Sequence, residues 1–237
     1  METKKLDVVY FVREGENEEL RYSLRSVDKN LPHRRLWIYG GKPEWANPDE
    51  FVQIPQNSTD KTKWDKVQEN LRRVAINDEI TEDFVLMNDD FFINQPITRI
   101  EPAIAGTLQQ HIERIERNYR NAPTTYTIEL RRAQRVLEEA GLPTNSYELH
   151  IPMIINRKKL AETLAFFTPR HATRSLYGNL NRVGGSRQKD CKIIRLGQPF
   201  DREARFLSSD DSTWGDTELG RFIRGRFPDK SRWEKSA

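Results

Sequence analysis

The sequence predicts an α/β fold in which a β-sheet is flanked by helices and a helical insertion occupies the middle of the chain. Short apolar runs rich in β-branched residues alternate with amphipathic segments between residues 6 and 87, and this alternation is typical of layered α/β proteins. Two arginine-rich segments with a helical pattern follow in the middle of the chain. No internal repeat, low-complexity tract or linker interrupts the sequence, so we expect one domain over residues 1–237.

The first 98 residues are expected to alternate strands with helices. Strands are predicted at residues 6–12, 36–39, 51–54 and 84–87. Asn17 is the expected N-cap of the first helix, whose apolar positions recur at helical spacing until Pro32 ends it. A second helix is predicted over residues 65–77, shortly before the last of these strands.

The middle and the end of the chain have a more helical pattern. Helices are predicted over residues 107–120, 127–140, 157–166 and 216–227, and the last of them ends before Pro228. Between these helices we expect an extended segment at residues 148–155, a basic loop at residues 183–190 and a strand at residues 191–196.

The composition indicates a polar protein without a membrane span. Hydrophobic residues make up 36% of the chain and charged residues 32%, and no apolar run approaches the roughly 20 residues that a membrane helix needs. The apolar run near the N-terminus is short and contains Asp7, so it predicts a strand and not a signal peptide. Cys191 is the only cysteine, which excludes an intramolecular disulfide. We therefore expect a cytoplasmic protein.

Charge is distributed unevenly, although the net charge of the 237 residues is only +3. Residues 1–98 contain 14 basic and 19 acidic side chains, residues 99–205 contain 19 and 11, and residues 206–237 contain 6 of each. This division predicts a metal-binding half, a basic helical half that meets an anion, and a C-terminal acidic loop with a helix. Ordinary surface variation is the alternative explanation.

An amide and two carboxylates, Asn88, Asp89 and Asp90, follow the apolar strand at residues 84–87 without a break. Ligands bind at the carboxyl ends of strands in α/β sheets. Adjacent carboxylates repel each other, and a bound Mg²⁺ or Mn²⁺ would offset that repulsion because hard cations prefer oxygen ligands. A metal site is therefore predicted here, with a surface turn as the alternative.

Three other groups of residues are candidates for functional residues, and each also has a purely structural explanation. Asp210 and Asp211 repeat the pattern of paired acids after an apolar pair, which is also typical of a loop before a helix. Arg21 and Arg25 lie four residues apart on one helix face and suit a diphosphate, or simply face solvent. His150 lies in an extended apolar segment, where a single histidine is usually structural.

The common sequence signatures of other enzyme classes are missing. The chain contains no G-x-x-x-x-G-K-[ST], G-x-G-x-x-G, H-E-x-x-H or G-x-S-x-G motif. The P-loop, dinucleotide-binding, zincin and serine-hydrolase interpretations are therefore removed.

Several stretches together resemble the Stealth family, the sugar-phosphate transferases of bacterial capsule synthesis and lysosomal-enzyme tagging. The stretches are LDVVYFV, EELRYSLRSV, RRLWIYGGKPEWAN and FVLMNDDFFINQP. Residues 7–10, 19–26 and 88–90 match the family's motifs, and residues 19–26 are the most specific match. The later stretches LHIPMIINRKKL, RHATRSLYGNL and FLSSDDSTWGD are similar to the family's remaining regions.

The resemblance implies a GT-A-like nucleotide-sugar transferase fold with a mixed sheet, a divalent metal, and a donor such as a UDP-sugar. Residues 1–98 would be the nucleotide-sugar and metal half, and a saccharide would be the acceptor. The implied metal ligands are Asp89, Asp90 and His150. The implied catalytic residues are Asp90, His150 and Asp211. The implied donor-binding residues are Asp7, Tyr10, Arg21, Arg25 and Asn88.

Two questions about the reaction stay open in the sequence. The family has Trp-Val-Asp/Asn-Gly after its first strand, whereas this chain has Phe-Val-Arg-Glu-Gly at residues 11–15, so either a glycosyl group or a sugar phosphate is transferred. The basic middle allows a polyanion acceptor such as hydroxymethylated DNA, whose base would have to leave the stack. The expected acceptor-binding residues are Arg131, Arg132, Arg135, Arg174 and Arg187. A non-catalytic nucleic-acid or polyanion-binding module on the same fold is the alternative.

Overall fold

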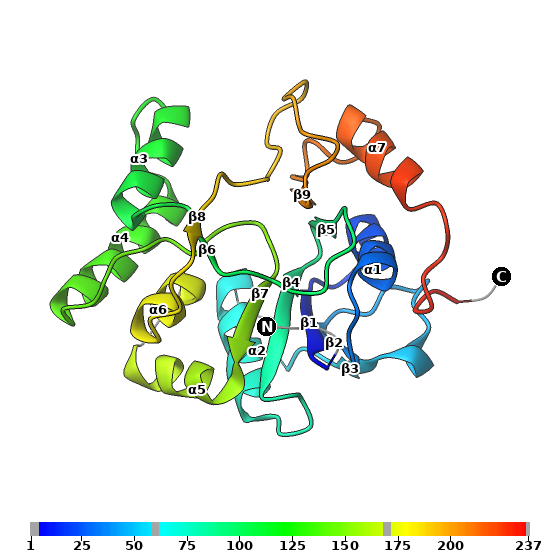
Figure 1. Cartoon of the computed structure of the whole chain (residues 1–237), viewed down its shortest axis with the longest axis horizontal. Helices are drawn as coiled ribbons and strands as arrows, with labels where there is room; N and C mark the ends of the chain where they lie inside the picture. Colours follow the sequence, from blue (N-terminus) through cyan, green and yellow to red (C-terminus); the bar gives the residue numbers. More distant parts are fainter. Residues whose placement is uncertain (1–4, 58–61, 168–171, 236–237) are drawn as a thin grey trace.

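The computed structural model describes residues 5–57, 62–167 and 172–235. Within these residues the main sheet has five strands in the order β3-β2-β1-β4-β7 (Figure 1). The strands are β1 (Asp7–Val12), β2 (Leu36–Gly40), β3 (Val52–Ile54), β4 (Asp83–Asn88) and β7 (Met153–Asn156). The first four are parallel and β7 is antiparallel to β4, so the predicted α/β fold with a mixed sheet is confirmed.

Strand β1 lies at the point where the strand order reverses. Val8 of β1 pairs with Leu36 of β2 on one side and with Val85 of β4 on the other. The chain moves outward from β1 to β2 and β3, and then returns to the other side of β1 with β4. In open α/β sheets the ligand crevice forms at such a reversal, outside the carboxyl ends of the strands. The ends of β1 and β4 are therefore where a ligand is expected.

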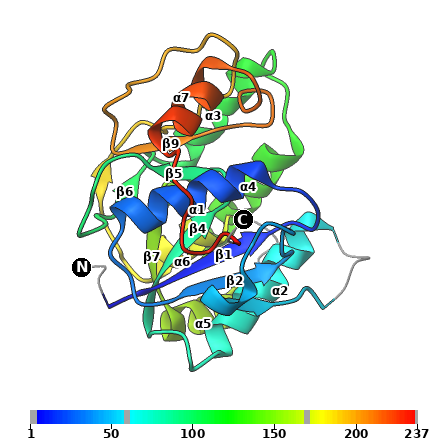
Figure 2. The ribbon, with the colours of Figure 1, turned by 90° about the vertical axis from the view of Figure 1, so that its right-hand side faces the viewer.

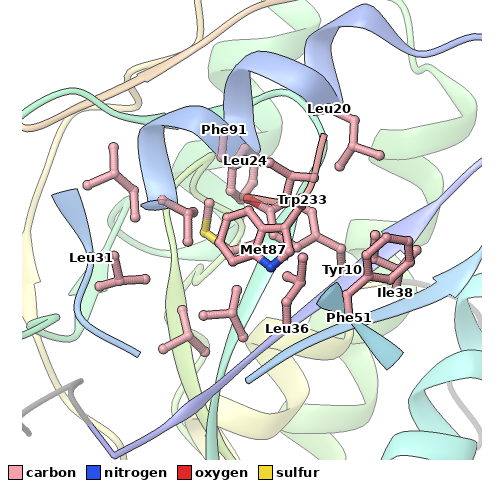
Figure 3. Close-up of a cluster of buried hydrophobic side chains, with 14 of the residues drawn as sticks. Tyr10, Leu20, Leu24, Leu31, Leu36, Ile38, Phe51, Met87, Phe91 and Trp233 are labelled. Atoms are coloured by element: carbon pink, nitrogen blue, oxygen red, sulfur yellow. The ribbon is translucent and has the colours of Figure 1, made fainter. Parts of the chain in front are cut away.

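Helices cover both faces of the sheet (Figure 2). On one face lies α1 (Glu18–Asn30), which buries Leu20, Leu24 and Val27 against alternate residues of β1, β2 and β4 (Figure 3). On the other face lie α2 (Lys63–Ile76), α5 (Arg157–Phe166) and α6 (Thr173–Leu180). Since successive strand residues point to opposite faces, the apolar strands supply both cores. Asn17 caps α1 as predicted, with its Oδ1 accepting the amide hydrogen of Leu20 at 2.9 Å.

The predicted helical insertion is present between β4 and β7. It consists of α3 (Leu108–Asn118) and α4 (Thr125–Glu139), which form a separate apolar cluster with Leu176 of α6. Thr107 and Thr124 cap the two helices, and the second starts two residues before the predicted position because Thr124 takes the cap. The stacked rings of Trp64 on α2 and Tyr126 on α4 connect the insertion to the main layer.

Smaller elements complete the described part of the chain. They are the single-turn helix η1 (Pro48–Glu50), the paired strands β5 (Phe91–Ile93) and β9 (Phe206–Ser208), the paired strands β6 (Ala103–Ile104) and β8 (Ser186–Arg187), and α7 (Glu218–Arg226). No helix among the described residues combines the length and the apolar character needed to cross a bilayer.

The predicted strand at residues 191–196 is wrong. This segment forms only an isolated bridge between Lys192 and Ser208, and of its apolar residues Ile193 is buried whereas Ile194 and Leu196 are exposed. Long-range polar contacts of its first residues, described below, hold the segment in place. The predicted extended segment at residues 148–155 becomes a strand only from Met153.

Candidate functional site

A pocket of about 680 Å³ opens at the carboxyl ends of β1 and β4. Phe11 and the turn at Arg13 and Glu14 supply the wall after β1, and Asn88 to Asp90 supply the wall after β4. Residues of α2 and α6 and the loop after β9 line the remaining sides. The pocket thus forms where the strand order predicts a ligand site.

Asp89 is held at the base of this pocket by the start of α1. Its Oδ2 accepts a hydrogen bond from Nδ2 of Asn17 at 2.6 Å, and Oδ1 of the same amide caps α1. Burial raises the pKa of the Asp89 carboxyl, and the neighbouring charge of Asp90 raises it further. One asparagine therefore connects the position of the helix to the position of the carboxylate.

Asp90 is paired with a cation from a distant part of the chain. Nζ of Lys192 lies 2.9 Å from Oδ2 of Asp90, and both side chains are largely buried. Burial opposes the charged form of Lys192, but the Asp90 carboxylate holds the pKa of the lysine above its ordinary value. This ion pair places Lys192 in the pocket wall.

Asp210 and Asp211 line the same pocket as Asp89 and Asp90. Strand β5 follows directly after Asp90, and its pairing with β9 joins Phe91 to Ser208. The amide of Ser209 also donates to the carbonyl of Asp90 at 3.3 Å. The two acid pairs are therefore brought together by one short antiparallel ladder.

Glu19 is a pocket residue that we did not predict as functional. It lies in the first turn of α1, it is buried, and its Oε1 accepts a hydrogen bond from Oγ of Ser209. Burial raises the pKa of Glu19 to about 7, and the charges of Asp89, Asp90 and Asp211 add to the increase. The signal in the sequence was its place at the start of the helix after β1, which faces the ligand crevice in this kind of sheet.

Arg174 is the one expected acceptor-binding residue that the structure brings to the pocket wall. Its Nη1 donates to the carbonyls of Leu149 and Ile151 at 2.7 Å and 2.9 Å. Burial lowers its pKa. Arg174 also lines a second, mostly apolar pocket of about 390 Å³.

Two amide side chains of α2 in the pocket wall have unused hydrogen-bonding capacity. Gln68 and Asn70 are buried, and their amide nitrogens donate to Thr173 at 2.7 Å and to Gln56 at 3.1 Å. Among the described residues, Oε1 of Gln68 and Oδ1 of Asn70 have no hydrogen-bond partner. Buried polar atoms nearly always have a hydrogen-bond partner, so these two oxygens indicate that the pocket binds a polar ligand.

The described lining of the pocket carries more negative than positive charge. Among the described residues that line it, seven are acidic and four are basic. The acidic ones are Glu14, Glu19, Asp89, Asp90, Glu148, Asp210 and Asp211. The basic ones are Arg13, Lys66, Arg174 and Lys192. An anionic ligand would therefore need additional positive charge in order to bind here.

Asp7 and Tyr10 do not reach the pocket. Asp7 lies at the amino end of β1, where its carboxylate accepts hydrogen bonds from Nε and Nη2 of Arg34 at 2.7 Å and 2.6 Å and from Nε1 of Trp37 at 2.8 Å. Tyr10 is fully buried in the core, with its hydroxyl 2.8 Å from Oγ of Ser23. The structure therefore gives both residues a role in the fold, and the predicted donor contacts are corrected.

Arg21 and Arg25 face the C-terminal segment and not the pocket. Arg25 donates from Nε and Nη2 to both carboxylate oxygens of Glu234, at 2.7 Å and 2.8 Å. Arg21 lies over the ring of Trp45, and its Nε is 3.6 Å from the same carboxylate. Their guanidinium groups are thus engaged in packing, and we correct the prediction that they bind a donor phosphate.

His150 is separated from the predicted metal site. Its Nδ1 lies 2.8 Å from Oδ2 of Asp190 and its ring meets that of Phe91 edge-on, but it does not line the pocket. In the part of the chain that the structure describes, no three His, Cys, Asp or Glu side chains gather as a metal-binding group. The predicted set of Asp89, Asp90 and His150 is therefore not assembled, and only the two aspartates lie in the pocket.

The other expected acceptor-binding arginines lie outside the pocket. Arg131 and Arg132 of α4 are exposed and form ion pairs with Glu116 and Glu129. Arg135 and Arg187 are exposed as well. The charges of Arg131 and Arg132 are therefore compensated locally.

No family model matches the chain, and no curated protein sequence matches it. Among solved structures, the chain is similar to the apo-form glycosyltransferase GlyE of Streptococcus pneumoniae TIGR4, with a TM-score of 0.49 and 11% sequence identity. The similarity covers 95% of this chain and 61% of the GlyE chain. The function is therefore inferred from the residues of the pocket.

Proposed function

We propose that this chain is a metal-dependent transferase that moves a glycosyl group from a nucleotide sugar, such as a UDP-sugar, to an acceptor hydroxyl. The observation that carries the proposal is the pocket at the ends of β1 and β4, where Asp89 and Asp90 share the wall with cationic side chains and with two amide oxygens that have no partner among the described residues. The resemblance of residues 7–10, 19–26 and 88–90 to Stealth transferases supports the use of a nucleotide-sugar donor, and a GT-A-like fold agrees with the strand order.

The charge of the pocket favours a divalent cation between protein and donor. A diphosphate is anionic and would be repelled by the excess of carboxylates. Mg²⁺ commonly uses one or two protein carboxylates together with substrate phosphates, and the adjacent Asp89 and Asp90 fit this requirement without a third acidic ligand. Asn88 and Asp211 line the pocket beside them. When bound, Mg²⁺ or Mn²⁺ would supply charge neutralisation on the departing phosphate.

In this proposal, other side chains bind the donor in place of Arg21 and Arg25. Arg13 follows β1 directly and lines the pocket, where its positive charge opposes the increase in the pKa of Asp89 that burial and Asp90 cause, so it lies near the expected diphosphate. Lys192 and Lys66 are further cations of the wall. The free oxygens of Gln68 and Asn70 can accept hydrogen bonds from donor hydroxyl or base N–H groups.

Glu19 is the best candidate for the base that removes the proton of the acceptor hydroxyl. A general base works best when its pKa lies near the working pH, and the pKa of Glu19 is raised to about 7. Its place in the pocket wall allows an acceptor to approach. Asp211, one of the catalytic residues that the resemblance implied, lies in the same pocket and is exposed.

The nucleotide product distinguishes the two possible reactions. Attack at the anomeric carbon releases UDP, whereas attack at phosphorus releases UMP and leaves the phosphate on the acceptor. We favour glycosyl transfer because Arg13 and Glu14 replace the family's residues in the turn that borders the donor.

The experiment is incubation with a panel of UDP-sugars, Mn²⁺ and either an oligosaccharide or hydroxymethylated DNA, followed by mass spectrometry. UDP supports the proposal, UMP supports sugar-phosphate transfer, and full transfer in the presence of a chelator refutes the role of the metal.

A saccharide is the preferred acceptor in this proposal. The described pocket lining is acidic, and two of the α4 arginines expected to bind a polyanion acceptor, Arg131 and Arg132, are already paired with glutamates. Both features oppose the approach of a DNA backbone. They also disfavour a non-catalytic polyanion-binding module, which would bind DNA without any dependence on metal or UDP.

A further inference from the structure

Three large apolar side chains are exposed together at one end of the molecule. Tyr119, Ile194 and Leu196 have 58%, 43% and 72% of their surface exposed. Tyr119 is the C-cap of α3, and the other two lie in the segment between β8 and β9. Nη2 of Arg195 donates to Oδ1 of Asn118 at 2.7 Å, which joins the two segments. Both views show them at the same end (Figures 1 and 2).

Three exposed arginines alternate with these apolar residues. They are Arg117, Arg120 and Arg195, and together with Tyr119, Ile194 and Leu196 we call them the apical surface. Among the described residues, Arg117 and Arg120 form no ion pair, and the hydrogen-bond partner of Arg195 is a neutral amide. The nearby Glu113 accepts a hydrogen bond from Gln109 on its own helix. The apical surface is therefore both apolar and positively charged.

We propose that the apical surface docks on a bilayer that contains anionic lipids. Apolar side chains on such a surface enter the boundary of the acyl chains while the cations meet the headgroups. A nucleic-acid backbone would satisfy the arginines but would leave Ile194 and Leu196 without apolar partners. A second copy of the chain would bring like charges together. An anionic membrane satisfies both parts of the surface.

The position of the apical surface relates it to the pocket. Ile194 is two residues from Lys192, which lines the pocket and binds Asp90. Docking would therefore hold the pocket close to the lipid surface, where a membrane-bound acceptor is available. The docking itself does not depend on the proposed transferase activity, because the surface contains none of the residues assigned to the reaction.

Vesicle flotation of the purified full chain tests the inference. We expect the protein to float with vesicles of equimolar phosphatidylcholine and phosphatidylglycerol at low ionic strength, and not with phosphatidylcholine alone. The double variant Ile194→Ser/Leu196→Ser should bind at least about tenfold more weakly, because it removes the two exposed apolar side chains that docking would bury in the bilayer. The matched control is Ile76→Ser/Phe166→Ser, whose residues are 77% and 62% exposed outside the apical surface, and it should bind like the wild type.

The charged part of the surface is tested in the same assay. Arg117→Ala/Arg120→Ala should reduce flotation with anionic vesicles and weaken its dependence on salt. Two results would overturn the inference. The first is a wild-type protein that does not float with anionic vesicles. Binding of duplex DNA through these arginines in place of vesicles would count as this result. The second is an Ile194→Ser/Leu196→Ser variant that remains folded by circular dichroism and floats like the wild type.

Discussion

Asp89 and Asp90 are neighbours in sequence but differ in their environments. Asp89 is half-buried, bonded to Asn17, and has a raised pKa, whereas Asp90 is paired with Lys192. Substitution of Asp89 removes an unfavourable charge, while substitution of Asp90 leaves a buried lysine without its partner. The two residues should therefore affect stability in different ways, although both are assigned to the metal.

We predict that Asp89→Asn lowers the transfer rate by about 100-fold or more while the melting temperature stays equal or rises. Asp90→Asn should lose activity to a similar degree and also melt at a lower temperature. Activity assays and thermal denaturation measure the two effects. Asp216→Asn is the control, because Asp216 is exposed and pairs with Arg221 on the surface, outside the pocket lining. Wild-type activity in Asp89→Asn would exclude this residue from the reaction.

Glu19 offers a second prediction, which concerns pH. Its folded-state pKa of about 7 lies above its ordinary value of 4.5. Its contribution to stability is therefore complete below pH 4.5 and is lost as the pH rises through about 7. Glu19→Gln should have a higher melting temperature than the wild type at pH 8, by roughly 2–4 °C for each kcal/mol gained in the free energy of unfolding. At pH 5 the difference in melting temperature should be smaller.

The neighbouring Glu18 gives a control in which stability changes with pH in the opposite direction. The pKa of Glu18 is lowered, mainly by its hydrogen bond to Arg224, so its contribution to stability is present at pH 8 and is lost in acid. Glu18→Gln should therefore melt slightly below the wild type at pH 8. Equal pH dependence in the two variants would contradict the environment assigned to Glu19.

The sequence predicted the acid pairs but not their neighbours. An apolar strand that runs directly into Asn88, Asp89 and Asp90 is a local signal, and the end of a parallel strand is a local property. The burial of Glu19 and the contact between Lys192 and Asp90 depend on segments that are 190 and 102 residues away. Asp7 and Tyr10 were assigned by family motif, and a motif contains residues that maintain the fold as well as residues that bind ligand.

At the scale of elements, α1 is attached to the C-terminal segment by a buried ion pair. Arg25 binds both oxygens of Glu234 and the carbonyls of Phe227 and Pro228, and Trp233 enters the core beneath α1 (Figure 3). The alternation of strands and helices was predictable from apolar periodicity. This attachment was not, because helical spacing shows only that Arg25 shares a face with Arg21.

We predict that Arg25→Ala destabilises the fold by about 3–5 kcal/mol, because it removes the bidentate ion pair that compensates the buried carboxylate of Glu234. Urea denaturation measures the loss. Arg221→Ala breaks an exposed pair and should cost less than about 1 kcal/mol. The affinity of folded Arg25→Ala for UDP with Mn²⁺ should equal that of the wild type. A selective loss of UDP affinity at unchanged stability would restore the original assignment of Arg25 to the donor.

At the scale of the whole molecule, the charge totals of the sequence and the charge of the pocket differ. The basic middle predicted an anion-binding half, but Lys192 from this half neutralises Asp90 of the acidic half, and Arg131 binds Glu116 within its own helix pair. A sum over sequence ranges cannot show which charges meet in the folded chain. The result is a basic protein whose main pocket is acidic.

This arrangement leads to a prediction about the folded chain with its ligands. UDP alone should stabilise the protein little, because the pocket repels a diphosphate, whereas UDP with Mn²⁺ should bind well. A ligand present at 100 times its dissociation constant stabilises the fold by about 2.7 kcal/mol, which for a chain of this size raises the melting temperature by roughly 5–10 °C. We therefore expect a shift with UDP and Mn²⁺ together that exceeds the sum of the separate shifts. Asp89→Asn, which remains folded, should lose this excess. A full shift with UDP in the presence of a chelator would mean that the cations of the wall suffice, and that the acidic pocket does not require a metal to bind its donor.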